Sequence, residues 1–270
     1  MAENLINNKS LSIRVCSNGL SFCTYTPGKE EPFEYKVIDV NHTISLAANL
    51  KEILRTEPML KQDYQRVNVL IATSRFTTVP VAAFQKEDIE SFFKFSFPKE
   101  KAQHVSYNVL RRSGIAIVFG LERSIYQLLL DDFPRARFYA AASTLIEFFS
   151  EKSLIGVGRK MYVYLHEKEM TVYAFNQGRM LFVNTFVATS VADIQYYTLH
   201  VWKELGFDQI DDSLFIVGDQ ELRTIELSEK IKYFLQNVDV IDRSEDFKER
   251  LTKGNSLIPY DLQTLLVCGF

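Results

Sequence analysis

Cysteine, glycine and proline are scarce in this 270-residue sequence, and it has no long hydrophobic run. With 11 glycines and 7 prolines, extended flexible or proline-rich linkers are not expected. The three cysteines, Cys16, Cys23 and Cys268, are an odd number without a CxxC pair, which is typical of a reduced protein. No stretch approaches the roughly 18 uninterrupted apolar residues of a membrane span, and residues 1–9 lack the apolar core of a signal peptide. We therefore predict a cytoplasmic protein with no direct membrane span.

The charge balance argues against an anionic partner. The formal net charge is −3, so the chain has no overall positive field with which to hold nucleic acid. Basic pairs such as Arg111-Arg112 are too short to mean more than solvated surface. Hydrophobic residues make up 47% of the sequence and charged residues 24%, as in a globular protein with a large core. We expect no nucleic-acid partner.

Residues 160–218 show the clearest pattern of secondary structure. Alternating apolar and polar residues, rich in Val, Tyr and Phe, predict three strands joined by tight turns. These strands are residues 160–166, 170–175 and 179–186. From Ser190 the apolar residues recur every three or four positions as far as Gly206, which predicts an amphipathic helix. Residues 214–218 then resemble a short buried strand, so the predicted order is strand, strand, strand, helix, strand.

The first half of the chain repeats this order. Its three predicted strands are residues 11–15, 20–25 and 33–40. A helix follows at 44–54 and ends before Pro58, and residues 67–72 form a compact buried strand. The two halves share the order of their elements but no sequence repeat. We therefore predict an α/β fold made of two lobes, each with a mixed sheet flanked by helices.

The rest of the sequence sets the predicted domain limits. Residues 74–120 add an extended segment, a helix and a strand pair that the second half lacks, so they predict an inserted subdomain. Gly156 and Gly158 end a charge-flanked stretch that is typical of a domain boundary. The predicted lobes are residues 1–155 and 156–270. After Gly218 we expect a helix, a strand at 238–241, a polar loop over 242–255 with a short helix, and a last helix at 261–267.

Several segments of the first half resemble a known superfamily. They are Ala72-Thr73-Ser74-Arg75-Phe76, Val79-Pro80, Ile89-Glu90-Ser91-Phe92-Phe93, Phe97-Pro98 and the strands around Tyr107 and Val118. Together with the duplicated order of elements, they resemble the cell-division and pilus-assembly branch of the actin-like ATPase (ribonuclease-H-like) fold. The whole chain also resembles a bacterial family described as a domain of unknown function with an actin-like ATPase fold.

This resemblance implies where a nucleotide site would lie. ATP hydrolysis in the superfamily needs acids that hold Mg²⁺ and glycines that let backbone N–H groups approach the phosphates. The first Asp-x-Gly phosphate motif falls on Ser17, Asn18 and Gly19, where a neutral hydroxyl replaces the acid. The second falls on Glu167-Lys168-Glu169, which has an acid but no glycine. The nucleoside-binding glycine pair falls on Val217, Gly218 and Asp219, where one glycine is left.

The residues themselves favour structural roles. Asn18-Gly19 is typical of a tight hairpin, in which glycine supplies the positive φ angle. Glu167 and Glu169 are expected in a solvated turn, and Gly218 at the end of a strand. The resemblance to the superfamily implies, in contrast, a degenerate nucleotide cleft. Its lining would consist of Ser17, Asn18, Gly19, Glu167, Gly218 and Asp219.

No other chemistry is indicated. The four histidines show no HExxH motif and no metal-ligand spacing with cysteine: His42, His104, His166 and His200. The hypothesis we favour is a non-catalytic binding or scaffold module with no cofactor and with another protein as its partner. The alternative is a divergent ATPase that binds ATP and Mg²⁺. A ribonuclease-H-type nuclease ranks last, because the strand at 11–15 carries no carboxylate. Phe92, Phe93, Phe95 and Phe97 are expected mainly in the core, with an exposed interface as the other interpretation.

Overall fold

The computed structural model describes residues 9–17, 19–27, 29, 32–100, 103–218, 221–242, 247 and 258–268. The chain forms two compact units. Unit 1 comprises Met1–Thr144 and Glu249–Phe270, and unit 2 comprises Leu145–Lys248. This division differs from the predicted one, because the end of the chain belongs to unit 1 and the first crossing lies inside a helix rather than at 155/156.

Unit 1 contains a five-stranded mixed sheet in the order β3-β2-β1-β4-β8. Its strands are β1 (Ser10–Cys16), β2 (Gly19–Tyr25), β3 (Phe33–Asp39), β4 (Arg66–Ile71) and β8 (Arg137–Ala140). The three strands at the start of the chain form an antiparallel meander. β4 pairs parallel with β1, and β8 pairs parallel with β4. The predicted meander and buried strand are therefore confirmed.

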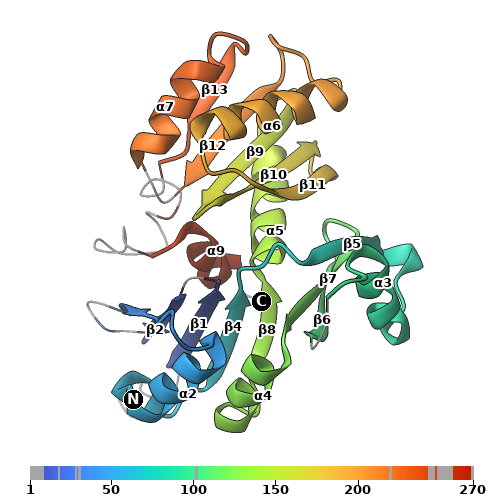
Figure 1. The fold of residues 1–270 in the computed structure, drawn as a ribbon. Coiled ribbons are helices and arrows are strands. Elements are labelled where there is room, and N and C mark those ends of the chain that lie inside the picture. The colour runs from blue at the N-terminus through green and yellow to red at the C-terminus, as the bar shows by residue number, and fades with distance from the viewer. Residues whose placement is uncertain are drawn as a thin grey trace. The chain divides into compact units, whose positions relative to one another are not determined.

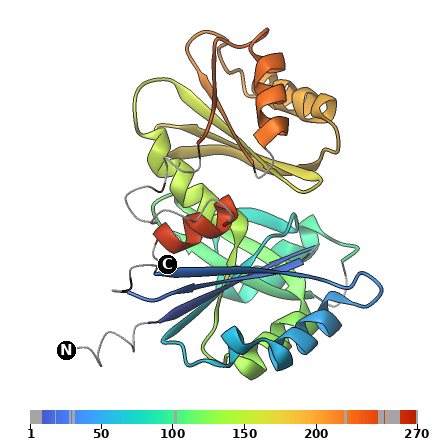
Figure 2. The same ribbon diagram turned by 90° about the vertical axis from the view of Figure 1, so that its left-hand side faces the viewer.

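Helices cover both faces of this sheet. Figure 2 shows α2 (Leu46–Thr56) and α4 (Arg123–Asp132) on one face and α9 (Tyr260–Cys268) on the opposite face. Ser45 caps the N-terminus of α2, because its Oγ accepts a hydrogen bond from the Ala48 N–H at 3.1 Å. The helix ends before the 3-10 turn Pro58–Lys61. Because side chains alternate along a strand, the central residues of β1 pack against helices on both faces.

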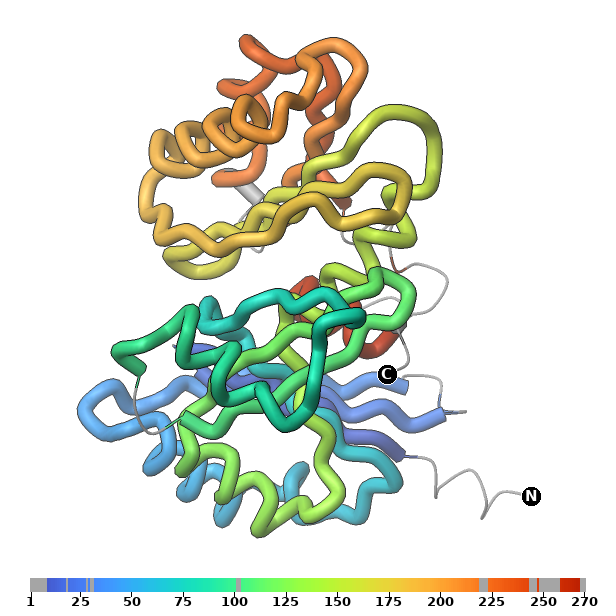
Figure 3. Tube along the Cα trace, turned by 90° about the vertical axis from the view of Figure 1, so that its right-hand side faces the viewer, coloured from blue at the N-terminus to red at the C-terminus, as the bar shows by residue number. Residues whose placement is uncertain are grey.

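A second, three-stranded sheet of unit 1 falls within the predicted insertion. Its order is β5-β7-β6, and the chain enters it after β4 and leaves it before β8 (Figure 3). Its elements are β5 (Phe76–Pro80), the 3-10 turns Val81–Ala83 and Lys86–Asp88, α3 (Ile89–Ser96), β6 (Gln103–Leu110) and β7 (Ile115–Glu122). α3 packs on the sheet through Phe93, whose ring lies where a side chain at Gly120 would be. Phe95, in contrast, is 90% exposed, so the phenylalanine cluster is split between core and surface.

Unit 2 repeats the sheet of unit 1. Its order is β11-β10-β9-β12-β13, again with an antiparallel meander followed by two parallel strands (Figure 1). The strands are β9 (Arg159–His166), β10 (Glu169–Asn176), β11 (Arg179–Val187), β12 (Ser213–Gly218) and β13 (Asn237–Val240). The identical strand order in both units confirms the predicted duplication.

The two faces of the unit 2 sheet pack differently. One face carries aliphatic residues such as Val163 and Val172, which form a core with α6 (Val191–Glu204) and α7 (Glu221–Ile231). On the other face the Phe149 ring of α5 (Ala141–Ser153) stacks on Tyr162 with centroids 4.3 Å apart. α6 starts with a capping box between Ser190 and Asp193.

The turns and helix ends of unit 2 follow local sequence signals. Gln177 and Gly178 have φ angles of 47° and 79°, the positive values that a two-residue type I′ hairpin requires. Gly206, with φ 64°, follows the end of α6 as predicted. Of the predicted polar loop at 242–255, only Asp242 and Phe247 lie within the described residues. Among these residues no helix is both long and apolar enough to cross a membrane.

Candidate functional site

The β1–β2 hairpin holds the first candidate loop. Ser17 is exposed at the turn, and Asn18 lies outside the described residues. Gly19 is the first residue of β2 and pairs with Cys16, whose Sγ donates a hydrogen bond to the Gly19 carbonyl at 3.3 Å. The positive φ angle predicted for Gly19 is not found, because the loop is Ser17-Asn18 and Gly19 already belongs to the strand.

Neither backbone strain nor packing explains the glycine at this position. An added Cβ on Gly19 would meet only the Ile38 carbonyl oxygen, at 3.9 Å, which is ordinary van der Waals contact. An alanine would therefore fit here.

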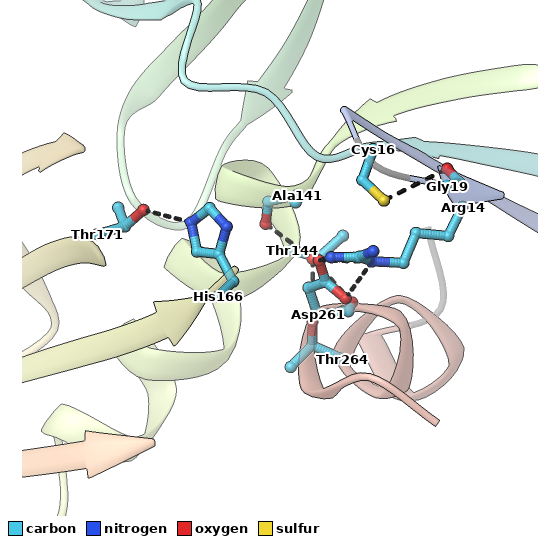
Figure 4. Close-up of polar contacts among 9 residues, drawn as sticks. All are labelled: Arg14, Cys16, Gly19, Ala141, Thr144, His166, Thr171, Asp261 and Thr264. Carbon is cyan, nitrogen blue, oxygen red and sulfur yellow. Dashed lines mark hydrogen bonds and ion pairs between the residues drawn. The ribbon is translucent and has the colours of Figure 1, made fainter. Parts of the chain in front are cut away.

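A buried ion pair lies close to this hairpin in the sequence. Arg14, three residues before Ser17, points at Asp261 of α9 (Figure 4). Its Nε lies 2.9 Å from both carboxylate oxygens, and its Nη2 lies 2.9 Å from Oδ2. Arg14 is 7% exposed and Asp261 is fully buried. Each charge therefore compensates the other, as a buried charge requires.

Hydroxyl groups extend the polar contact around Asp261. Thr264 Oγ1 lies 2.7 Å from the Asp261 carbonyl oxygen and 2.9 Å from Thr144 Oγ1. Thr144 Oγ1 also lies 3.0 Å from the Ala141 carbonyl oxygen (Figure 4). All these side chains are buried. The network joins α9 to β1 and to the start of α5, within unit 1.

The sequence carries a signal for this ion pair that the predicted site residues did not include. Arg14 is the one charged residue of β1, and Asp261 is the one charged residue of α9. A charge in a buried element needs a partner of opposite sign. The two residues are 247 positions apart, so their pairing follows from the tertiary fold alone.

The β9–β10 hairpin of unit 2 holds the second candidate loop. Glu167 and Lys168 connect the paired residues His166 and Glu169. Glu167 has a φ angle of 51°, which is uncommon for a residue other than glycine. Arg223 of α7 donates from Nη1 to the Glu167 carbonyl at 3.1 Å and from Nη2 to the Ala188 carbonyl at 2.6 Å. The guanidinium thus holds the turn against the end of β11.

His166 belongs to a polar row across the same sheet. Its Nε2 lies 3.3 Å from Thr171 Oγ1 (Figure 4). The Thr171 oxygen in turn lies 2.9 Å from Thr185 Oγ1. The ring also stacks on Tyr164 with centroids 5.1 Å apart. These contacts give His166 a structural role in the sheet. Within the described residues, no group of three His, Cys, Asp or Glu side chains is arranged to hold a metal ion.

Gly218 is the last residue of β12, as expected for a strand end, and its surroundings require a glycine. An added Cβ would lie 2.9 Å from Leu165 Cβ, 3.1 Å from the Leu165 carbonyl oxygen and 3.1 Å from Thr224 Cγ2. Close packing of β12 on β9 and α7 therefore accounts for this residue. The neighbouring Asp219 lies outside the described residues.

Most of the chain matches one protein family. The family described as "Protein of unknown function (DUF3822)" matches residues 2–238. The chain belongs to this DUF3822 family. No protein with curated annotation matches it.

Two solved structures show the fold of this DUF3822 protein. One is a Bacteroides thetaiotaomicron protein described as having an actin-like ATPase fold and unknown function. It is 32% identical, with a TM-score of 0.84 and 99% of each chain covered. The other is the PilM–PilN type IV pilus biogenesis complex, at 8% identity and a TM-score of 0.56, covering 96% of this chain and 98% of that one. The predicted actin-like ATPase fold is thus confirmed, and the chain shares its fold with the PilM–PilN structure.

Proposed function

We propose that this DUF3822 protein is a non-catalytic member of the actin-like fold that works as a binding or scaffold module. The observation that carries the proposal is Ser17 at the tip of the first hairpin. The fold's phosphate motif has a magnesium-holding acid at this position, whereas a serine hydroxyl brings no negative charge. The charged residue that precedes Ser17 in β1 is Arg14, and Asp261 already compensates its charge.

The second hairpin supports the same conclusion. Glu169 stands where the motif has a glycine, so a carboxylate replaces the open backbone that a phosphate would approach. Two like charges about 4 Å apart repel by about 4 kcal/mol at an effective dielectric constant of 20. The main chain of this turn is also bound by Arg223, through the Glu167 carbonyl. We infer that both nucleotide motifs are degenerate.

A protein is the partner class that the fold favours. The PilM–PilN structure, which shares the fold, is described as a complex of two proteins. A two-unit frame without magnesium chemistry still offers large surfaces for such a contact. We therefore propose another protein, and not nucleic acid, as the partner.

Thermal unfolding with and without Mg-ATP tests the proposal. A ligand at a hundred times its dissociation constant adds about 2.7 kcal/mol to stability. For a chain of this size that corresponds to a rise in Tm of roughly 5 to 10 °C. We expect no rise at millimolar Mg-ATP and no release of phosphate. A magnesium-dependent rise, or steady ATP hydrolysis, would overturn the proposal.

A divergent ATP-binding protein is the second candidate, and Gly19 is the observation that favours it. Neither its φ angle nor its packing requires glycine, because an added Cβ would meet only the Ile38 carbonyl oxygen, at 3.9 Å. Glycines of this kind let phosphates approach the backbone. Gly19→Ala separates the two candidates, because it leaves folding unchanged. Only a nucleotide site at the hairpin would make Mg-ATP binding weaker in this variant.

A further inference from the structure

One edge of the unit 2 sheet is a strand without the usual protection. Among the described residues β11 pairs only with β10, so it forms the edge of the sheet (Figure 1). It is nine residues long, and none of its residues is buried. After Arg179 the strand contains neither a charged residue nor a proline. Proteins commonly place such residues on edge strands, where they prevent pairing with another chain.

The other edge strands that the structure describes are protected. β8 and β13 have four residues each, and a short strand offers few backbone groups for pairing. β3 carries Glu34, Lys36 and Asp39, and β5 ends at Pro80. Asn108 joins β6 to a carbonyl group of β8, at 2.8 Å. Within the described part of the chain, β11 is therefore the edge that is open to a further strand.

The backbone of β11 presents hydrogen-bonding groups away from the sheet. The Ala188 N–H donates to the Lys168 carbonyl at 2.9 Å, so this residue points toward β10. The register of β11 on β10 is regular as far back as Phe182. Backbone groups alternate in direction along an antiparallel strand, so Phe182 also points toward β10. It follows that Val183 and Thr185 point outward.

A side chain occupies one of these outward groups. The Asn184 Oδ1 accepts a hydrogen bond from the Thr185 N–H at 3.0 Å. A local contact of this kind substitutes for the hydrogen bond that a neighbouring strand supplies, and a strand carbonyl would replace it. An edge with outward N–H and C=O groups is completed by an extended segment, whose backbone carries the matching groups. The edge thus specifies a strand as its occupant.

The sequence of β11 matches a second copy of itself. Its central residues read Phe-Val-Asn-Thr-Phe, which is symmetric in residue character about Asn184. In an antiparallel pair centred on Asn184, Phe182 lies opposite Phe186 of the second copy. In the same pair Val183 lies opposite Thr185 of the second copy, so the outward backbone groups meet. Aromatic and β-branched pairs of this kind stabilise adjacent strands, and no like charges face each other.

The surface beside this edge is apolar. Phe186 stacks on Tyr197 of α6 with centroids 4.7 Å apart, and the Tyr197 ring lies 5.3 Å from that of Tyr196. Tyr196 is 62% exposed, and Val187 at the end of the strand is 69% exposed. Exposed apolar surface that continues from a strand onto a helix is typical of a protein interface. This surface adds side-chain contacts to the backbone pairing.

We propose that β11 is the contact between two copies of this chain, which pair antiparallel about a two-fold axis at Asn184. The two five-stranded sheets of unit 2 then form one continuous sheet. This inference goes beyond the proposed function, because it concerns self-association and does not depend on whether nucleotide binds.

Sedimentation equilibrium of the full-length protein over about 1 to 100 μM tests the proposal, and we expect a monomer–dimer equilibrium. Asn184 is exposed, so its replacement leaves unit 2 folded, as the fluorescence of Trp202 would show. Asn184→Asp and Asn184→Lys each place like charges opposite one another at the axis. Each should weaken the dimer at least about a hundredfold. An equal mixture of the two variants should restore dimers that contain one chain of each.

A control variant and hydrogen exchange locate the contact. Asn176→Asp is the matched control, because Asn176 is an exposed residue of β10 away from the open edge, and its effect should stay within about twofold. In the dimer the outward N–H of Val183 gains a partner. Its exchange, followed by NMR, should therefore be at least about tenfold slower at high than at low protein concentration. The Phe182 N–H points toward β10 and should change little.

Three outcomes would overturn the proposed pairing. They are a chain that stays monomeric up to about 100 μM, a dimer that Asn184→Asp leaves intact, and exchange of the Val183 N–H that does not depend on concentration. Protection of this N–H by an added extended peptide, in a chain that stays monomeric, would also overturn it, in favour of a strand from another protein.

Discussion

Replacing Asp261 by alanine tests whether a buried ion pair holds the last helix of unit 1. The variant leaves the Arg14 guanidinium, with 7% exposure, without its carboxylate. Removing one member of a buried pair leaves an uncompensated charge and costs about 3–5 kcal/mol. We expect Asp261→Ala to lower the free energy of unfolding of unit 1 by this amount.

A second variant separates the charge from the packing. In Arg14→Met with Asp261→Leu, both charges are replaced by apolar groups of similar size. Such replacements are often neutral or stabilising, so we expect the double variant to recover at least about 3 kcal/mol of the loss. Glu226→Ala serves as the control for an exposed pair, because Glu226 and Lys230 are roughly half exposed. Its cost should be at most about 0.5 kcal/mol.

Urea unfolding with two probes measures these effects. Trp202 lies in unit 2, so its fluorescence follows that unit, whereas far-UV circular dichroism follows both units. With a slope of about 2 kcal/mol per molar urea, Asp261→Ala should lower the midpoint of unit 1 by about 2 M. A loss below about 1 kcal/mol, or a double variant as unstable as the single one, would refute the reasoning.

Three further outcomes follow from the packing and burial of single residues. Gly218→Ala should destabilise the protein by about 1–3 kcal/mol, because the added methyl group overpacks the site. Gly19→Ala should cost less than about 0.5 kcal/mol. Equal melting temperatures for the two variants would contradict these contacts. Burial lowers the pKa of His104, so the unfolded state binds more protons, and stability should fall as the pH drops below about 6.5. In His104→Gln the free energy of unfolding should fall less between about pH 7.5 and 5 than in the wild type, as urea unfolding at the two pH values would show. An equal fall in both proteins would contradict the role of His104. Burial raises the pKa of Cys23 to about 12, so a maleimide should label this thiol only in denaturant, as mass spectrometry of the labelled peptides would show.

Local patterns were sufficient to predict most of the elements. The alternation in β9, β10 and β11 and the helical period of α6 are properties of short segments, which tertiary packing then reinforces. The register of the first hairpin was harder to predict. Gly19 was assigned to the turn, but the structure pairs it with Cys16, because register depends on which face of each strand is buried.

Long-range arrangement could not be predicted from these patterns. α9 returns to unit 1 through the packing of Leu262 and Leu265 and through the pairing of Arg14 with Asp261, across 247 residues. A surface pocket lined by Trp202, Phe207 and Phe234 could not be predicted either, because these residues come from α6, the loop after it and a segment before β13 that meet only after folding. Gly218 was placed at a strand end from sequence, whereas its contact with Thr224 of α7 needed the structure.

Calorimetric titration of Mg-ATP into the full-length protein tests the proposed absence of a nucleotide site most directly. We propose that Ser17 and Glu169 replace the acid and the glycine of the fold's phosphate motifs, so we expect only the heat of dilution, both with and without magnesium. A saturable isotherm that disappears when magnesium is chelated, and that weakens in Gly19→Ala, would contradict the account.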